Sequence, residues 1–242
     1  MTTAKQLWNN FCHAHGIAAN SVPLFATDRD GFVETKEIGK KAKRKVLTRH
    51  REMEELILKE TDILVGDWFQ KAHEYDGLIY IMYRRGSDTS LEPLYIGKAE
   101  TFGRGDRNLS ANIINLRASK DKFARWGDNY AYHIGDLSAA VLTNHPVEKR
   151  NPKYSAWATK LFQSAPTDQP KLAFDIYFWA KAWKSTDVGV WPELSPTRLA
   201  FLEYLLIGVA STVFNGSLLN YEGRNRFSVQ TAAIPVPTGS CG

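Results

Sequence analysis

The chain contains only two cysteines, Cys12 and Cys241, near its opposite ends. Two such residues provide neither a disulfide framework nor a cysteine-based zinc site, so a reduced compartment is expected. No apolar run reaches the roughly 18 residues that a transmembrane helix requires, and no membrane partner is expected. The N-terminus MTTAKQLWNNFCHAHG lacks the continuous apolar stretch of a signal peptide. These absences together predict a cytoplasmic location.

A moderate surplus of basic residues is present instead. The 242 residues include 31 lysines and arginines against 26 aspartates and glutamates, a formal net charge of +5 at pH 7. This balance permits nucleic acid as a partner without requiring it. The sequence is 43% hydrophobic and 12% aromatic, so it can bury one substantial core and carry an accessory segment.

The residue pattern changes near position 76. Residues 1–75 are predicted to form a basic, helical N-terminal segment and are a candidate DNA-binding arm. Residues 76–222 carry a different pattern, in which β-branched and aromatic runs alternate with helical ones. The proline- and glycine-rich residues 223–242 are expected to be a flexible tail.

Three segments are typical of β-strands: GLIYIMYRR at 77–85, LYIGKA at 94–99 and KLAFDIYFWAKAW at 171–183. The first two are joined by the turn-forming GSDTSLEP and predict a hairpin. Helices are expected at 106–127 and after Ser195–Pro196, where a serine cap precedes proline. The expected fold class is α+β, with a small antiparallel three-stranded sheet flanked by helices and a helical N-terminal extension.

A basic run within the expected N-terminal helix is a candidate nucleic-acid contact. The segment KKAKRKVLTRHR holds seven lysines and arginines in twelve residues, and an acidic stretch follows them rather than alternating with them. Such a run is either a solvated helix face or a surface that contacts phosphates. A helix also fits the major groove, where arginine and lysine can pair with guanine. The candidate DNA-binding residues are Lys40, Lys41, Lys43, Arg44, Lys45, Arg49 and Arg51.

A single carboxylate interrupts the apolar helix that follows Pro196. Residues 199–210 are otherwise apolar, and the exception is Glu203. A glutamate on the buried side of a helix loses its hydration, at a cost of several kcal/mol unless a partner compensates. Glu203 therefore either points to solvent or belongs to a site that uses its charge.

The order of these parts resembles the GIY-YIG nuclease superfamily. The tripeptide YIG at 95–97 matches the second signature of the family, and Tyr80 takes the tyrosine position of the first. The first signature is imperfect, because GLIY carries one residue more than glycine-X-tyrosine. Glu203 and Asn215 are twelve residues apart, as in the closing pattern of the family. The resemblance covers about 77–220.

This resemblance implies a domain organisation and a metal ligand. Residues 76–222 would be a GIY-YIG-like nuclease domain with an insertion at about 135–170. Glu203 would bind one divalent cation, Mg²⁺ or Mn²⁺, since Mg²⁺ keeps most of its waters and needs few carboxylates. Asn215 would position the glutamate helix or a phosphate, and it could equally cap the helix end.

The resemblance also implies roles for the hairpin. Tyr95, together with Tyr80, would contact the attacking water. A tyrosine has an ordinary pKa near 10 and needs a nearby cation to act as a base, and Lys98 would supply that charge. The alternative is that both tyrosines are ordinary strand aromatics.

An arginine that holds the scissile phosphate is a further implied component, because its planar guanidinium binds phosphate through two hydrogen bonds. Arg125 in KFARWG is the preferred candidate, and Arg104 and Arg107 lie closer to YIG in the sequence. Tyr130 and His133 are candidates for an additional proton acceptor. A structural role is the alternative for the histidine.

The function implied by the resemblance is a metal-dependent endonuclease that hydrolyses DNA phosphodiester bonds, most like the stand-alone restriction enzymes. DNA is the expected partner, and a second copy of the chain in a homodimer is a further candidate. One alternative is a nucleic-acid-binding protein on the same scaffold that cuts weakly or no longer cuts. Another is a structural protein in which YIG is accidental.

Overall fold

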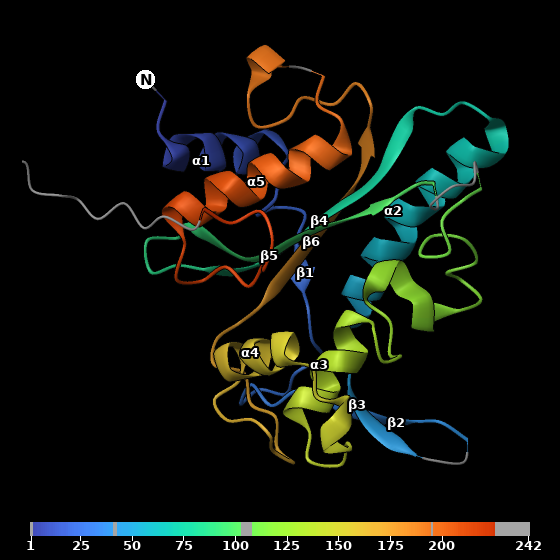
Figure 1. The fold of residues 1–242 in the computed structure, drawn as a ribbon, viewed down its shortest axis with the longest axis vertical. Helices are drawn as coiled ribbons and strands as arrows, with labels where there is room; N and C mark the ends of the chain where they lie inside the picture. Colours follow the sequence, from blue (N-terminus) through green and yellow to red (C-terminus); the bar gives the residue numbers. More distant parts are fainter. Residues whose placement is uncertain (1, 41–42, 103–107, 195, 226–242) are drawn as a thin grey trace, which may run out of the picture.

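The computed structural model describes residues 2–40, 43–102, 108–194 and 196–225 (Figure 1). Its centre is an antiparallel four-stranded sheet in the order β1-β6-β4-β5. These strands are β1 (Val22–Pro23), β4 (Tyr75–Arg85), β5 (Leu91–Glu100) and β6 (Tyr177–Lys184). The α+β class is confirmed, whereas the three-stranded sheet expected from the sequence is wrong by one strand.

The additional strand comes from the N-terminal segment. Val22 pairs with Phe178 and Pro23 pairs with Tyr177 along the outer side of β6. A proline is tolerated there because an edge strand does not need every backbone N–H for pairing. Two residues are too few to show the alternation by which a strand is recognised in a sequence.

The hairpin of β4 and β5 forms as the sequence predicts. Tyr80 lies opposite Gly97, and Met82 lies opposite Tyr95. Both faces of β4 are buried, which explains why its sequence is continuously apolar rather than alternating. One face carries Leu78, Tyr80 and Met82, and the other carries Ile79, Ile81 and Tyr83.

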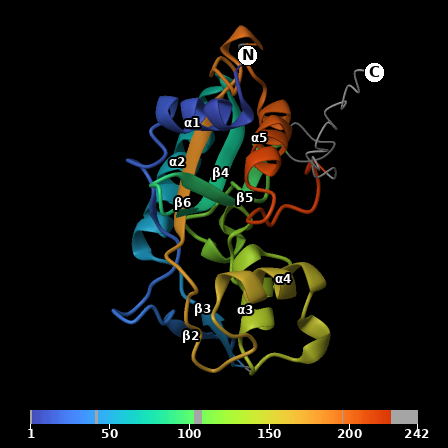
Figure 2. The same ribbon diagram turned by 90° about the vertical axis from the view of Figure 1, so that its left-hand side faces the viewer.

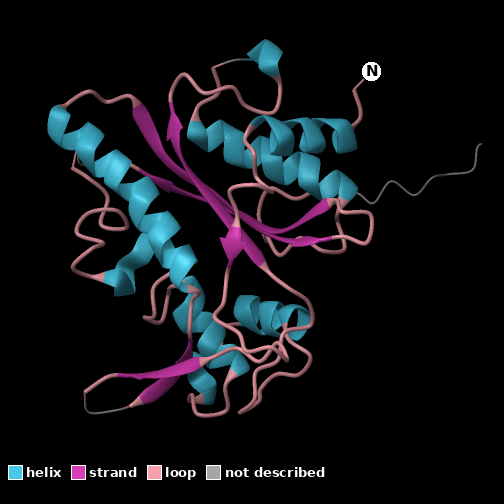
Figure 3. Ribbon diagram, turned by 180° about the vertical axis from the view of Figure 1, so that it is seen from behind, coloured by secondary structure: helices cyan, strands magenta, loops and turns pink. Residues whose placement is uncertain are grey.

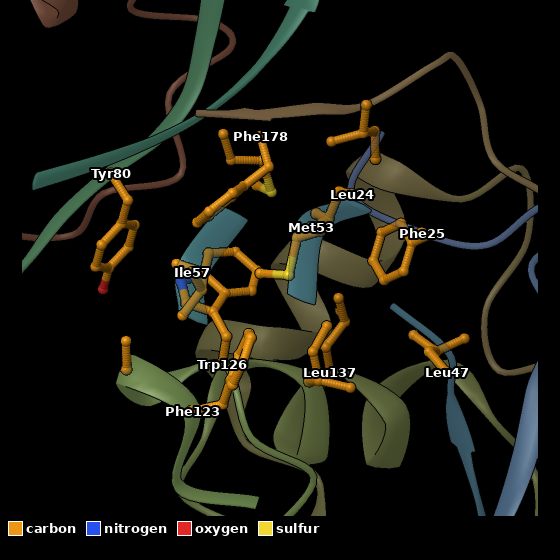
Figure 4. Packing of buried hydrophobic residues seen from close by; sticks show 14 of the residues in the cluster. Leu24, Phe25, Leu47, Met53, Ile57, Tyr80, Phe123, Trp126, Leu137 and Phe178 are labelled. Carbon is orange, nitrogen blue, oxygen red and sulfur yellow. The ribbon is translucent and has the colours of Figure 1, made fainter. Parts of the chain in front are cut away.

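Helices cover both faces of the sheet. Helix α1 (Ala4–Ala14) packs against α5 (Leu199–Val213) on one face. Helices α2 (Arg51–Gln70), α3 (His133–Val141) and α4 (Pro152–Leu161) belong to the other layer (Figures 1 and 2). In that layer Tyr80 and Phe178 of the sheet face Met53 and Ile57 of α2 (Figure 4). The N-terminal 75 residues thus supply α1, β1 and α2 to the same body, in which the sheet lies between two layers of helices.

The expected continuous helix across the basic run is wrong. Strands β2 (Thr35–Ile38) and β3 (Arg44–Leu47) form a separate antiparallel hairpin there, and α2 starts only at Arg51 (Figure 3). Val46 and Leu47 are buried, and the N–H of Leu47 donates to the Ser138 Oγ of α3 at 3.0 Å. These tertiary contacts override the helical preference of the lysines and arginines.

The helix expected at 106–127 is also wrong. The described part of this segment consists of turns and a kinked 3₁₀ helix, η1 (Lys120–Arg125). Asn115, Ala124 and Arg125 have positive φ angles, which a regular helix does not allow. The apolar residues that suggested a helix are nevertheless buried: Leu109, Ile113, Leu116 and Phe123.

Several remaining elements differ in extent from their predictions. Strand β6 starts at Tyr177 rather than near residue 171, and α5 starts at Leu199. The segment 135–170 consists mainly of α3, α4 and a short 3₁₀ helix, η2 (Val147–Lys149), and another, η3 (Pro192–Leu194), precedes α5. Residues 226–242 of the expected tail lie outside the described residues. Among the described helices, none has the length and apolar character needed to cross a membrane.

Arg49, a candidate DNA contact, is buried beneath the basic hairpin. Its exposed fraction is 3%, and Nη1 donates to the Trp126 carbonyl at 2.5 Å and to Asp128 Oδ1 at 2.8 Å. Nη2 donates to Glu54 Oε1 at 3.0 Å. The guanidinium therefore joins α2 to the turn before α3 and does not reach solvent. This position corrects its assignment as a phosphate contact.

Arg49→Met is expected to lower the free energy of unfolding by about 3 kcal/mol, because it removes a buried guanidinium from two partly buried carboxylates and leaves the Trp126 carbonyl without this donor. Arg51→Met, two residues later, is the matched control. Arg51 is exposed, and its one ion pair within the described part of the chain is with Glu55 at 3.3 Å, so its loss should change stability by less than about 0.5 kcal/mol. Urea denaturation of both variants measures the difference, and equal stabilities would contradict a structural role for Arg49.

Candidate active site

A cavity of about 450 Å³ lies at the outer edge of β5. Its walls come from β5, α4, α5 and the segment that follows α5. The lining residues are Tyr95, Lys153, Glu203, Tyr204, Ile207, Asn220, Tyr221 and Glu222. Two residues selected from the sequence, Tyr95 and Glu203, therefore meet at one cavity.

Asn220 fixes the chain across the edge of β5. Its Oδ1 accepts from the Ile96 N–H at 2.9 Å, and its Nδ2 donates to the Ile96 carbonyl at 2.7 Å. The Leu219 N–H donates to the Leu94 carbonyl at 2.6 Å. An amide side chain thus replaces a neighbouring strand and satisfies backbone groups that an edge strand would otherwise leave unpaired. Tyr221 and Glu222 reach the cavity because Asn220 is held in this way.

Asp76, at the start of β4, fixes the beginning of α5. Its Oδ2 accepts from the Leu199 N–H at 3.0 Å and from Arg198 Nε at 2.7 Å. A carboxylate at the first turn satisfies an otherwise unpaired N–H and interacts favourably with the helix dipole. Gly77 has φ +149°, and a Cβ there would lie 2.3 Å from the Ala99 carbonyl oxygen and 2.8 Å from Leu199 Cδ2 at the start of α5. The close approach of these elements sets the position of Glu203, one turn into α5.

Glu203 is half-buried in the cavity wall. Burial raises its pKa above the ordinary value, the positive charge of Lys98 opposes that shift, and the negative charges of Glu100 and Glu222 add to it. The ionised carboxylate is thus held in a place that disfavours its charge. A hard divalent cation would compensate the negative charge of the carboxylate. Two neighbouring carboxylates with room for water suit Mg²⁺ or Mn²⁺. Among the described residues no cluster of three metal-ligating side chains occurs, so Glu203 and Glu222 are the available carboxylates.

Tyr80 and Tyr95 lie on one face of the β4–β5 hairpin, and α5 packs against the other face. Their ring centroids are 6.2 Å apart. Gly97 lets Tyr80 approach the strand, because a Cβ there would lie 2.6 Å from Cε2, Cζ and the hydroxyl oxygen of Tyr80. The glycine of YIG therefore makes room for the tyrosine of the preceding strand, which is a steric reason for the pairing of the two motifs.

His133 connects Tyr80 to the helices below it. Its Nε2 lies 3.3 Å from the Tyr80 hydroxyl, and its Nδ1 lies 2.7 Å from the Tyr154 hydroxyl. The imidazole stacks on Trp157 with a centroid distance of 5.4 Å. Burial, then the charges of Lys153 and Arg125, hold its pKa well below the ordinary value. His133 is therefore neutral, and it links Tyr80 to Tyr154 by hydrogen bonds.

A lysine that the sequence did not single out, Lys153, lies over the Tyr95 ring. Lys98 forms an ion pair with Glu100 and acts electrostatically on Glu203. Lys153 of α4 instead places Nζ 5.2 Å from the Tyr95 ring centroid. The pKa of Tyr95 is raised to about 12, chiefly by burial and then by the charge of Glu203, whereas the charge of Arg125 lowers it. Tyr95 is thus a phenol at neutral pH and can hold a water or donate a proton.

Arg125 lies within electrostatic reach of this group. Its charge lowers the pKa of both Tyr95 and Lys153, and its guanidinium carbon is 5.4 Å from the Tyr132 ring centroid. The side chain is exposed, and the backbone adopts φ +70°. Arg125 is therefore an exposed cation whose charge acts on the site, and it is not one of the residues that line the cavity.

Other candidates lie away from the cavity. Asn215 accepts from Arg224 at 2.6 Å, and Tyr130 pairs with His145 at 2.6 Å. Arg104, Arg107 and Lys41 lie outside the described residues. In the hairpin of β2 and β3, Lys43 pairs with Glu37 and Arg44 lies over the Tyr130 ring. Lys40, Lys43 and Lys45 are exposed.

Six cavity residues were not identified from the sequence. Tyr204 and Ile207 lie on α5 itself, and the remaining four are Lys153, Asn220, Tyr221 and Glu222. Lys153 belongs to the segment interpreted as an insertion, and the last three follow the helix that holds Glu203. Only an NYE tripeptide soon after the glutamate helix could have drawn attention to the last three. Comparison of the chain with known protein families, curated proteins and solved structures found no match to any of them.

Glu203→Gln is expected to stabilise the fold at pH 7. The pKa of Glu203 is higher in the folded protein than in the unfolded chain. The free energy of unfolding therefore falls as the pH rises from the unfolded pKa through the folded pKa, and the ionised group is unfavourable for folding at neutral pH. The gain in Tm should disappear as the pH falls below about 4.5, where both states are protonated. Thermal unfolding at pH 7 and pH 4 tests this, with exposed Glu55→Gln as the control. A Tm for Glu203→Gln below that of the wild type at pH 7 would contradict the electrostatic account.

Proposed function

We propose that this protein is a metal-dependent endonuclease that hydrolyses DNA phosphodiester bonds and resembles the restriction-type GIY-YIG enzymes. The observation that supports this most strongly is the convergence of Tyr95, Glu203 and Lys153 on one cavity. A phenol, a half-buried carboxylate and a cation provide proton transfer, metal binding and phosphate neutralisation. These are the three requirements of phosphodiester hydrolysis.

Glu203, with Glu222 beside it, would hold Mg²⁺ or Mn²⁺. When bound, such an ion neutralises phosphate charge and stabilises the leaving oxygen. Lys153 and Arg125 face the same region and would orient the phosphate, the arginine through its planar pair of donors. Tyr95 would contact the attacking water, and its hydroxyl position depends on Tyr80 and His133 behind it.

A second candidate function is a DNA-binding protein that does not cut. The raised pKa of Tyr95, to about 12, favours this alternative because a buried phenol is a weak general base. A cation bound at Glu203 would oppose the carboxylate charge that contributes to this shift. The two candidates therefore differ in their response to metal.

The purified protein is expected to cut plasmid or phage DNA with Mg²⁺ and to leave it intact with EDTA. Glu203→Gln should abolish cleavage but not DNA binding. Tyr95→Phe should lower the rate by about 10²–10⁴-fold, the usual contribution of a proton-transfer group, and Tyr80→Phe should have an equal or smaller effect. Tyr177→Phe on β6 is the control. Wild-type rates for both hairpin variants would show that the hairpin is only structural.

Lys153→Met is expected to lower the cleavage rate at saturating DNA by about 10²–10³-fold, as for loss of one stabilising donor at a reaction centre. Lys153→Arg should recover part of this rate because the charge is kept. Lys149→Met, at an exposed lysine outside the cavity, is the control. A wild-type rate for Lys153→Met would contradict a catalytic role for Lys153. Lys98 would then be the candidate cation, and a reduced rate for Lys98→Met would support it.

A further inference from the structure

A second cavity of about 350 Å³ adjoins the candidate active site. It lies where α4 faces the chain after α5, and it shares three lining residues with the first cavity: Lys153, Asn220 and Tyr221. The two cavities are therefore neighbouring parts of one surface. A linear ligand that occupies the first can continue into the second.

The two cavities differ in charge. The first contains Glu203 and Glu222 beside Lys153. The second contains Lys160 and Arg224 beside the same lysine, and no carboxylate occurs among the described residues that line it. The first cavity is thus suited to a cation together with a phosphate, whereas the second is suited to an anion alone.

Neutral oxygens orient the two cations of the second cavity without neutralising them. Lys160 Nζ donates to the Gly216 carbonyl, and Arg224 Nη2 donates to the Asn215 carbonyl at 2.7 Å and to its Oδ1 at 2.6 Å. Burial lowers the pKa of Lys160, and the charges of Arg224 and Arg84 lower it further. Like charges are therefore held close together at a partly buried place, an arrangement that a bound anion would relieve.

We propose that Lys160 and Arg224 form a binding subsite for a backbone phosphate of the nucleic-acid strand, next to the phosphate at the Glu203 cavity. This inference rests on the proposed function, because the first cavity fixes where the strand is cut. Lysine and arginine are the usual phosphate ligands, and a strand offers a phosphate at every nucleotide. The shared wall of Lys153, Asn220 and Tyr221 makes a strand phosphate a better occupant than a free ion.

Duplex DNA binding should be measured in EDTA, by fluorescence anisotropy at several salt concentrations. Lys160→Gln with Arg224→Gln is expected to weaken binding and to reduce the slope of log K against log salt by about 0.9, the value for one phosphate contact. The charge-matched control is Lys59→Gln on α2 with Lys184→Gln on β6, which removes two distant cations. Arg224→Lys keeps the charge and should retain the slope. Thermal unfolding checks that each variant is folded.

The outcomes separate the subsite from the nuclease activity. A slope that stays at the wild-type value, or falls equally in the Lys59/Lys184 control, overturns the subsite even if the wild type cuts DNA. Binding without Mg²⁺-dependent cleavage refutes the proposed function, and the slope still decides the subsite. A titration with orthophosphate provides the last arm. If the Lys160→Gln with Arg224→Gln variant loses affinity for orthophosphate but keeps the wild-type slope of log K against log salt for DNA, the site binds free phosphate. That result would overturn the assignment to the strand.

Discussion

The unpaired edge of β5 is the constraint on which the candidate site depends. An outer strand leaves backbone N–H and C=O groups without partners, and the Asn220 side chain satisfies both groups of Ile96. This contact turns the chain after α5 back against the sheet. Tyr95, beside the core of one layer, and Glu203, on the helix of the other, consequently meet around the strand edge. Without the Asn220 contact the cavity would lose one wall.

The electrostatics of the site follow from that arrangement. Glu203 is half-buried near the carboxylates of Glu100 and Glu222. The positive charge of Lys98 on β5 partly compensates its negative charge. Tyr95 and its supporting residues are covered by Lys153, whose Nζ lies 5.2 Å from the Tyr95 ring and 5.5 Å from the Trp157 ring. The strand lysine thus acts on the carboxylate, whereas the lysine of α4 acts at the tyrosine. The segment 135–170 is in this sense a wall of the site rather than an appendage.

The sequence was sufficient where a short local pattern determines the structure. A run of β-branched and aromatic residues predicts β4, and a second short apolar run after a turn-forming loop predicts β5. One carboxylate in an apolar helix draws attention to Glu203. The sequence pattern was insufficient where contacts between residues far apart in the chain determine the structure. The strand β3 forms because Val46 and Leu47 pack against α3, and the charge of Arg49 is needed in the interior rather than at the surface. Likewise Asn220 and Lys153 acquire their positions only when α4 and the chain after α5 meet β5.

The most direct test of the central claim is the location of a bound metal ion. Mn²⁺ added to the protein in the absence of DNA broadens nearby nuclear magnetic resonance signals, because its unpaired electrons accelerate relaxation. Signals of Tyr95 and Lys153 should broaden first in the wild type, those of Trp8 on α1 should persist, and the selective effect should be absent in Glu203→Gln. The same broadening of Tyr95 and Lys153 in Glu203→Gln, or broadening that spares both residues in the wild type, would contradict a metal-dependent reaction centre at the edge of β5.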